Sequence, residues 1–165
     1  MRLLICAGGT GGGVYPALAV HSALTAKVRD LDTLWVGGEG GMEESLVKRQ
    51  GIAFQSIPAA GIHGVGLATM PRNLAMIGRG ILASRRILKE FQPDVLFFTG
   101  GFVAVPMALA GRSISSMLYV PDIEPGMALK SLSGFADMIA VTTSQSQRFF
   151  NKKVFETGYP LRADL

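Results

Sequence analysis

The sequence predicts an α/β protein built on one doubly wound parallel sheet. Short apolar segments alternate with longer helix-like segments through the 165 residues. A run of glycines joins the first apolar segment to the first helical one, and a second glycine pair follows a later apolar segment. Strands that alternate with helices form a parallel sheet covered on both faces, and glycine-rich strand-to-helix turns suit such sheets.

The composition limits the classes of protein to which this chain can belong. Hydrophobic residues make up 48% and charged residues 17%, which predicts one globular domain with a real core. The net charge of +4 suits an anionic ligand or an anionic membrane surface, and no basic patch interleaved with aromatics predicts nucleic-acid binding. Cys6 is the single cysteine, so an intrachain disulfide is excluded. Without a signal peptide or an apolar run of about 18 residues, we expect a cytoplasmic protein.

The first half of the chain predicts three strands and three helices. The strand-like segments are apolar or rich in β-favouring residues such as Trp35 and Val36. One short helix has acidic residues at its start and basic residues at its end, as the helix dipole favours. The predicted strands are residues 2–6, 32–36 and 53–57, and the predicted helices are residues 14–27, 42–50 and 71–91.

The predicted helix at 71–91 has an apolar face and a basic face. Apolar side chains recur at helical spacing at Leu74, Ile77, Ile81, Leu88 and Phe91. Arginines recur every seven residues on the opposite face, at Arg72, Arg79 and Arg86. Leu67 and Met70 lie just before these arginines in the sequence. Together these residues predict either contact with anionic lipid headgroups or a solvated basic face on a core-packed helix.

The second half predicts four further strands and places the loops that follow them. The predicted strands are residues 94–98, 117–120, 138–141 and 153–156, with helices at 105–110 and 127–133 and a helical turn within 142–149. Loops at 8–13, 58–70, 100–102 and 122–126 all follow strands. Because ligands bind at the carboxyl ends of parallel strands, we expect these loops to converge on one edge of the sheet.

The glycine segment at 8–16, GGTGGGVYP, predicts an anion-binding turn. Glycine allows close approach of a ligand to the backbone, and a helix N-terminus carries about half a positive charge. The backbone N–H groups of this segment are therefore the expected ligands of an anion. No lysine follows, so this is no P-loop, and G-x-G-x-x-G is not met. A tight turn without a ligand is the alternative.

Several motifs together resemble one known family. They are GGTGGGVYPALA at 8–19, GGFVAVP at 100–106, Pro125-Gly126, Phe135-Ala136-Asp137 and GYPLR at 158–162. In order and spacing they are similar to the amino-terminal domain of the peptidoglycan N-acetylglucosaminyltransferases, glycosyltransferase family 28 of the GT-B type. The resemblance implies that residues 1–165 form one Rossmann-like domain on the acceptor and membrane side. It also implies that the chain ends at the interdomain hinge and that the UDP-sugar domain is absent.

The resemblance implies an inverting hexosyltransferase that moves N-acetylglucosamine from UDP to a lipid-diphosphate-linked sugar in peptidoglycan synthesis. It thereby implies roles in cell wall biogenesis, cell shape and cell division. UDP-N-acetylglucosamine would bind through the missing domain, so the isolated domain would be inactive. The other expected partners are the lipid-linked acceptor and an anionic membrane surface, on the inner face of the plasma membrane. No cofactor and no metal are implied.

The same resemblance suggests roles for individual residues. The expected ligands of the acceptor diphosphate are Thr10, Gly11, Gly12, Gly13, Gly100, Gly101, Phe102 and His63. The family usually has a histidine where this chain has Gly13, so the catalytic base is expected at Asp122, with Glu124 and His63 as other candidates. Asp122 is equally explained by turn or helix capping, and His63 by a solvated loop. Arg162 would approach the donor from the hinge, or lie in a solvated terminus.

Two other functions stay open from the sequence. The first is a nucleotide- or dinucleotide-binding oxidoreductase domain, in which Glu39 after the second strand would bind a ribose. The second is a non-catalytic relative of the transferases that lost activity when Gly13 replaced the histidine.

Overall fold

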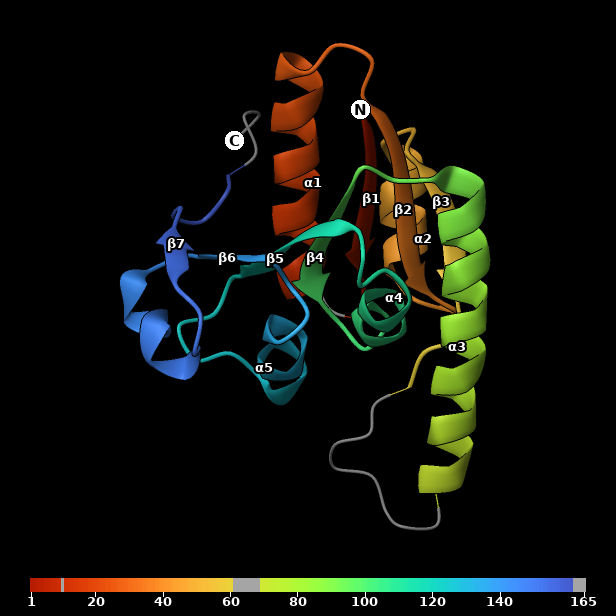
Figure 1. Cartoon of the computed structure of the whole chain (residues 1–165). Helices are drawn as coiled ribbons and strands as arrows, with labels where there is room; N and C mark the ends of the chain where they lie inside the picture. Colours follow the sequence, from red (N-terminus) through yellow and green to blue (C-terminus); the bar gives the residue numbers. More distant parts are fainter. Residues whose placement is uncertain (10, 61–68, 162–165) are drawn as a thin grey trace.

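The computed structural model describes residues 1–9, 11–60 and 69–161. Within them, seven strands form one parallel sheet in the order β3-β2-β1-β4-β5-β6-β7 (Figure 1). The strands are β1 (Arg2–Ala7), β2 (Asp32–Gly38), β3 (Ala53–Ile57), β4 (Val95–Gly100), β5 (Ser115–Val120), β6 (Met138–Val141) and β7 (Val154–Glu156). The helices are α1 (Gly11–Lys27), α2 (Glu43–Arg49), α3 (Met70–Phe91), α4 (Ala104–Ala110) and α5 (Met127–Ser133), with a 3₁₀ helix, η1 (Ser144–Phe149). The predicted parallel α/β fold is confirmed.

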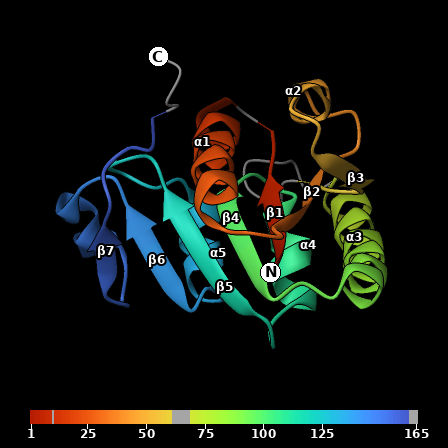
Figure 2. The same cartoon turned by 90° about the horizontal axis from the view of Figure 1, so that it is seen from above.

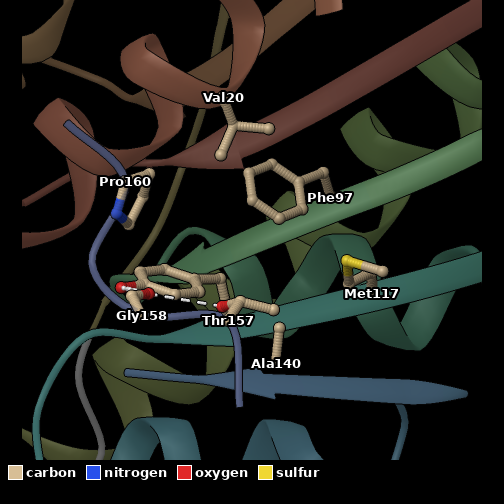
Figure 3. Close-up of a pocket in the computed structure, with 8 residues that line it drawn as sticks. Val20, Phe97, Met117, Ala140, Thr157, Gly158 and Pro160 are labelled. Carbon is tan, nitrogen blue, oxygen red and sulfur yellow. Dashed lines mark hydrogen bonds between the residues drawn. The ribbon is translucent and has the colours of Figure 1, made fainter. Parts of the chain in front are cut away.

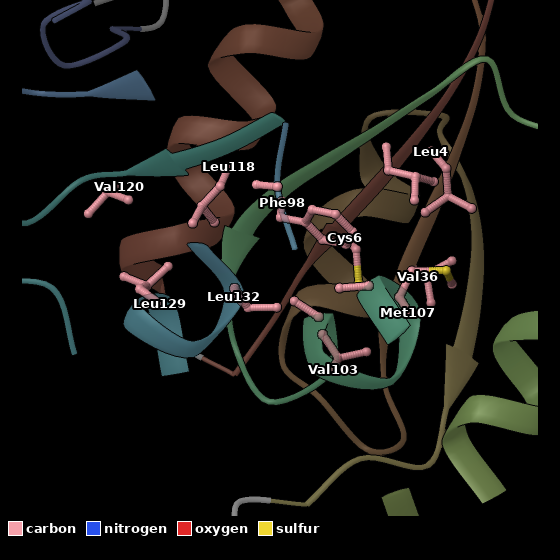
Figure 4. Close-up of a cluster of buried hydrophobic side chains, with 14 of the residues drawn as sticks. Leu4, Cys6, Val36, Phe98, Val103, Met107, Leu118, Val120, Leu129 and Leu132 are labelled. Carbon is pink, nitrogen blue, oxygen red and sulfur yellow. The ribbon is translucent and has the colours of Figure 1, made fainter. Parts of the chain in front are cut away.

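Helices cover the two faces of the sheet in two groups, α1 and α2 on one face and α3, α4 and α5 on the other (Figures 1 and 2). Successive residues of β1 point to opposite faces, so Leu4 and Cys6 join one buried cluster while Leu3 and Ile5 join the other. Figure 4 shows the larger cluster, where side chains of α4 and α5 pack on the central strands. Helices thus pack on both faces of the sheet and fix the positions of the carboxyl ends of its strands.

Two details of the predicted helices are wrong. Helix α1 begins at Gly11, three residues earlier than predicted, so glycines form its first turn. On α3, Leu74 is 54% exposed, whereas the buried face contains Ile77, Gly80, Ser84, Ile87 and Leu88. The sequence pattern counted only large apolar residues, but a closely packed helix face also uses small ones.

Two glycines of α3 offer a matched pair of substitutions. A Cβ on Gly80 would run into the backbone oxygen of Pro58 and lie 3.1 Å from Cβ of Pro106, whereas Gly78 has open space around it. We expect Gly80→Ala to lower the free energy of unfolding by about 1–3 kcal/mol through overpacking. Gly78→Ala should raise it by about 0.5–1 kcal/mol through helix propensity. Urea denaturation of both variants measures this, and equal effects would contradict the packing described here.

Candidate functional site

The two glycine turns meet where the strand order of the sheet changes direction. Strands β1 and β4 are neighbours, with β2 and β3 on one side and β5 to β7 on the other. Ligands of doubly wound sheets bind at such a switch point. Gly100, the last residue of β4, and Gly101, which follows it, have positive φ angles of 114° and 84°. A Cβ on Gly101 would collide with the backbone oxygen of Gly8, so the two turns are in close backbone contact.

A cavity of about 320 Å³ lies between these turns and the segment that follows β5. The predicted site residues that line it are Gly12, Gly13, Gly100, Gly101, Phe102 and Asp122. Gly11, the first residue of α1, directly precedes Gly12 in the sequence. Three of the four loops expected at this edge therefore meet around one cavity. The fourth, at 58–70, lies largely outside the described residues.

The wall of the cavity formed by α1 offers hydrogen-bond donors. The first N–H groups of a helix have no partner within the helix, and here Gly12 and Gly13 of the first turn line the cavity. The helix dipole adds a partial positive charge at this end. The hydroxyl of Thr99 donates to the carbonyl oxygen of Gly13 at 2.8 Å, in a buried hydrogen bond. This bond joins the start of α1 to the end of β4.

Gly13 is also tightly enclosed. A Cβ at this position would lie 3.0 Å from the backbone oxygen of Thr99 and 3.2 Å from its hydroxyl oxygen. A histidine here would therefore require Thr99 to move by a few tenths of an ångström. In this chain the position contributes backbone atoms to the cavity and no side chain.

Of the two acidic residues after β5, only Asp122 lines the cavity, and its side chain is exposed. Glu124 is exposed and is not part of the cavity wall. The segment between them is held by Ser146, whose buried hydroxyl donates to the carbonyl oxygen of Ile123 at 2.9 Å. Asp122 does not cap α5, because Gly126 is the N-cap residue and no side-chain hydrogen bond caps that helix.

Sequence reasoning missed Glu43, which it treated only as an acidic residue at a helix start. Its side chain is fully buried directly behind the first glycine turn. One carboxylate oxygen accepts the N–H of Gly38 at 2.8 Å, and the other accepts the N–H of Gly9 at 3.3 Å. Burial, with a smaller contribution from the Glu43 charge, raises the pKa of the neighbouring Cys6 thiol. The dense glycines at 37–41 are the sequence signal that could have indicated a buried group here.

The other predicted site residues lie away from the cavity or outside the described part of the chain. Thr10, His63, Leu67 and Arg162 belong to the residues that the structure does not describe. Arg72, Arg79 and Arg86 are exposed on α3, and Met70 begins that helix. Arg86 is paired with Glu90 at 2.9 Å, so its charge is partly compensated. In Figure 1 the first turns of α3 extend beyond the carboxyl end of β4.

A second cavity, of about 160 Å³, lies on the α1 face of the sheet near the end of the described chain (Figure 3). Its walls include Val20 of α1, Phe97 of β4, Met117 of β5 and Pro160. None of the described residues that line it has a charged side chain. It therefore does not suit a phosphate ligand. Among the described residues, no helix is long and apolar enough to cross a membrane.

Comparison with known proteins shows the family of this chain. Residues 3–141 match the glycosyltransferase family 28 N-terminal domain. The chain belongs to glycosyltransferase family 28. This assignment favours the transferase prediction over the oxidoreductase alternative. The described fold corresponds to the amino-terminal half of the GT-B architecture.

Curated relatives align with the whole length of this chain. It is 38% identical, over its full length, to a UDP-N-acetylglucosamine–N-acetylmuramyl-(pentapeptide) pyrophosphoryl-undecaprenol N-acetylglucosamine transferase of Desulforudis audaxviator. It is 36% identical to the enzyme of the same name from Geotalea uraniireducens. The chain covers 45% and 46% of these two proteins, so it spans about half the length of the curated relatives it matches.

Solved structures show the same architecture. The crystal structure of MurG from Acinetobacter baumannii superposes with a TM-score of 0.79 at 26% identity, over 95% of this chain and 44% of that one. A UDP-N-acetylglucosamine 2-epimerase from Neisseria meningitidis superposes with a TM-score of 0.67 at 12% identity, over 97% of this chain and 47% of that one. The second likeness concerns the fold alone.

Proposed function

We propose that this chain is the acceptor-binding half of an N-acetylglucosaminyltransferase that acts on a lipid-diphosphate-linked sugar in peptidoglycan synthesis. The observation that carries the proposal is the cavity between the two glycine turns, in a chain whose relatives are transferases of that name. The sugar donor, UDP-N-acetylglucosamine, binds to the other half of such a protein. The activity would serve cell wall biogenesis, and through it cell shape and division.

A diphosphate suits this cavity for three reasons. The N–H groups at the start of α1 have no hydrogen-bond partner within the helix. The positive end of the helix dipole lies at the same place and would attract the anion. The glycines present backbone without side chains, so a bulky anion can approach closely. Among the described residues, the cavity wall contains a single carboxylate, that of Asp122, and the rest of this lining is uncharged.

Asp122 is the proposed general base. In an inverting transfer the acceptor hydroxyl attacks the anomeric carbon of the sugar while UDP leaves, and a carboxylate can remove the proton from that hydroxyl. In the described part of the chain Asp122 is the one carboxylate that lines the cavity, and Gly13 supplies no side chain for this role. The acceptor diphosphate held by the glycine turns would bring the hydroxyl toward Asp122.

Binding of an isoprenoid diphosphate tests the proposed cavity directly. We expect the 165-residue chain to bind farnesyl diphosphate measurably in isothermal titration calorimetry, and farnesyl monophosphate at least tenfold more weakly, because only the diphosphate fills both glycine turns. The chain alone should transfer no sugar from UDP-N-acetylglucosamine. Absence of diphosphate binding, or sugar transfer by this chain alone, would contradict the proposal.

Contact with an anionic membrane is the second part of the proposal. The basic face of α3 and its extension beyond the carboxyl end of β4 would bring the membrane to the edge where the lipid-linked acceptor binds (Figure 1). This corresponds to a peripheral protein at the cytoplasmic face of the plasma membrane. Exposed Leu74 adds apolar surface to the first turns of α3.

Vesicle binding tests the membrane contact. Each arginine near an anionic surface contributes about 1 kcal/mol, so Arg72→Ala with Arg79→Ala should weaken binding to phosphatidylglycerol vesicles about 30-fold. Arg86→Ala alone should have a smaller effect, because Glu90 already pairs with it. Lys27→Ala with Arg29→Ala, at the opposite edge of the sheet, is the matched control. Equal losses in both double variants, measured by co-sedimentation, would indicate non-specific attraction and contradict the proposed surface.

A further inference from the structure

Glu43 is the one fully buried ionisable carboxylate among the described residues, and no step of the proposed reaction uses it. It begins α2, and its side chain reaches back under the carboxyl ends of β1 and β2. Burying a charged carboxylate is costly unless strong hydrogen bonds compensate for the lost water. Its place in the fold therefore needs an explanation.

The carboxylate bridges the first glycine turn and the end of β2. Its two oxygens accept from Gly9, in the first glycine turn, and from Gly38, at the end of β2. Both ion pairs described in the structure, Lys48 with Glu44 and Arg86 with Glu90, lie on the surface and neither includes Glu43. Hydrogen bonds from N–H groups to an ionised carboxylate are among the stronger ones in proteins.

The surrounding glycines make room for this carboxylate. A Cβ on Gly8 or on Gly41 would collide with it, and a Cβ on Gly37 would lie 2.7 Å from one of its oxygens. Gly8 in the first glycine turn, Gly37 in β2 and Gly41 after β2 thus leave the space that the Glu43 carboxylate occupies. The packing is specific to a carboxylate-sized group at this position.

We propose that Glu43 is a positioning residue that holds the Gly8–Gly9 turn from behind, so that the N–H groups at the start of α1 face the acceptor diphosphate. The N–H of Gly9 is engaged by Glu43, which leaves the donors of the α1 first turn for the ligand. This inference rests on the proposed function, because it assumes that the cavity binds a diphosphate. Glu43 itself does not touch the ligand.

The charge of Glu43 makes the proposal testable, because simple repulsion and positioning of the turn change the affinity for a diphosphate in opposite directions. A negative charge near an anion site repels the anion, so removing it without disturbing the turn would strengthen diphosphate binding. Removing a carboxylate that positions the turn would weaken binding instead. Glutamine has nearly the shape of glutamate, but its amide nitrogen cannot accept an N–H. Glu43→Gln therefore separates the two roles.

We expect Glu43→Gln to weaken binding of farnesyl diphosphate by about tenfold, measured by calorimetry on the 165-residue chain. Glu44→Gln is the matched control, because Glu44 is the next residue of α2 and pairs on the surface with Lys48. It should leave the dissociation constant unchanged. Gly41→Ala should weaken binding as well, because its Cβ would displace the same carboxylate from outside the cavity. Unchanged or tighter binding by Glu43→Gln would overturn the proposal.

Amide hydrogen exchange provides a readout that does not need the ligand. In Glu43→Gln, the N–H of Gly9 or Gly38 should exchange at least tenfold faster, while the amides of Leu4 and Ile5 in β1 keep their protection. Unchanged exchange at both glycines would overturn the positioning role, whatever the binding data show. If the unsubstituted chain binds no diphosphate, the proposed function fails, and faster exchange would still establish that Glu43 holds the turn.

Discussion

Replacing Gly101 by alanine is expected to abolish diphosphate binding and to lower the free energy of unfolding by about 2–5 kcal/mol. Two separate costs add at this position. The residue has a φ of 84°, a conformation that costs a residue with a side chain about 1–2 kcal/mol. The added Cβ would also run into the backbone of Gly8, which forces the two glycine turns apart. The cavity between them would lose its shape.

Urea denaturation and calorimetry with farnesyl diphosphate measure the two effects of Gly101→Ala. Gly126→Ala is the matched control, since Gly126 also lines the cavity but has open space and a φ of −63°. Its loss of stability should stay below about 1 kcal/mol, the cost of a poorer N-cap residue. Circular dichroism at low temperature would verify that the Gly101 variant is folded when binding is measured. Retained binding in that folded variant would show that the contact between the turns is not needed.

The second large effect is expected at Asp122. In a protein that joins this chain to a UDP-sugar-binding half, Asp122→Asn should lower kcat for sugar transfer by about 10²- to 10⁴-fold. Asparagine has a similar shape but cannot take up a proton near neutral pH. Binding of the acceptor should change much less, since the N–H groups of α1 remain in place. Single-turnover kinetics with a lipid-diphosphate acceptor separate the two quantities.

Glu124→Gln is the control for Asp122, because Glu124 lies two residues away and does not line the cavity. It should keep nearly full activity. A loss of activity in Glu124→Gln with full activity in Asp122→Asn would reverse the proposed roles. Activity of the joined protein with Gly13 unchanged would also reject the idea that this chain is a non-catalytic relative.

Local patterns in the sequence were enough to predict most elements. The bounds of β3, α5 and β6 agree with the predicted residues 53–57, 127–133 and 138–141. Each of these short segments is bounded by glycine, proline or polar residues that end regular structure within one or two positions. The alternation of strands and helices likewise implied a parallel sheet, and with it a single edge where the loops after the strands meet.

The site itself depends on contacts between distant parts of the chain. The order of the strands puts the turn after β4 beside the turn after β1, and only then does Gly101 meet Gly8. The start of α1 at Gly11 is accompanied by the buried hydrogen bond from Thr99, 86 residues away from Gly13. No local pattern contains that information, because helix propensity alone disfavours three glycines in a first turn.

By itself, the sequence determined the fold class, the positions of the elements and the edge of the sheet that carries the candidate site, since these follow from hydrophobic periodicity and turn residues over a few positions. Only the tertiary structure decided which loops touch, that Asp122 and not Glu124 lines the cavity, and that Glu43 is buried behind the glycine turn. The reason is physical: burial and hydrogen-bond partners are set by side chains and backbone groups that the folded sheet brings together from far apart in the chain.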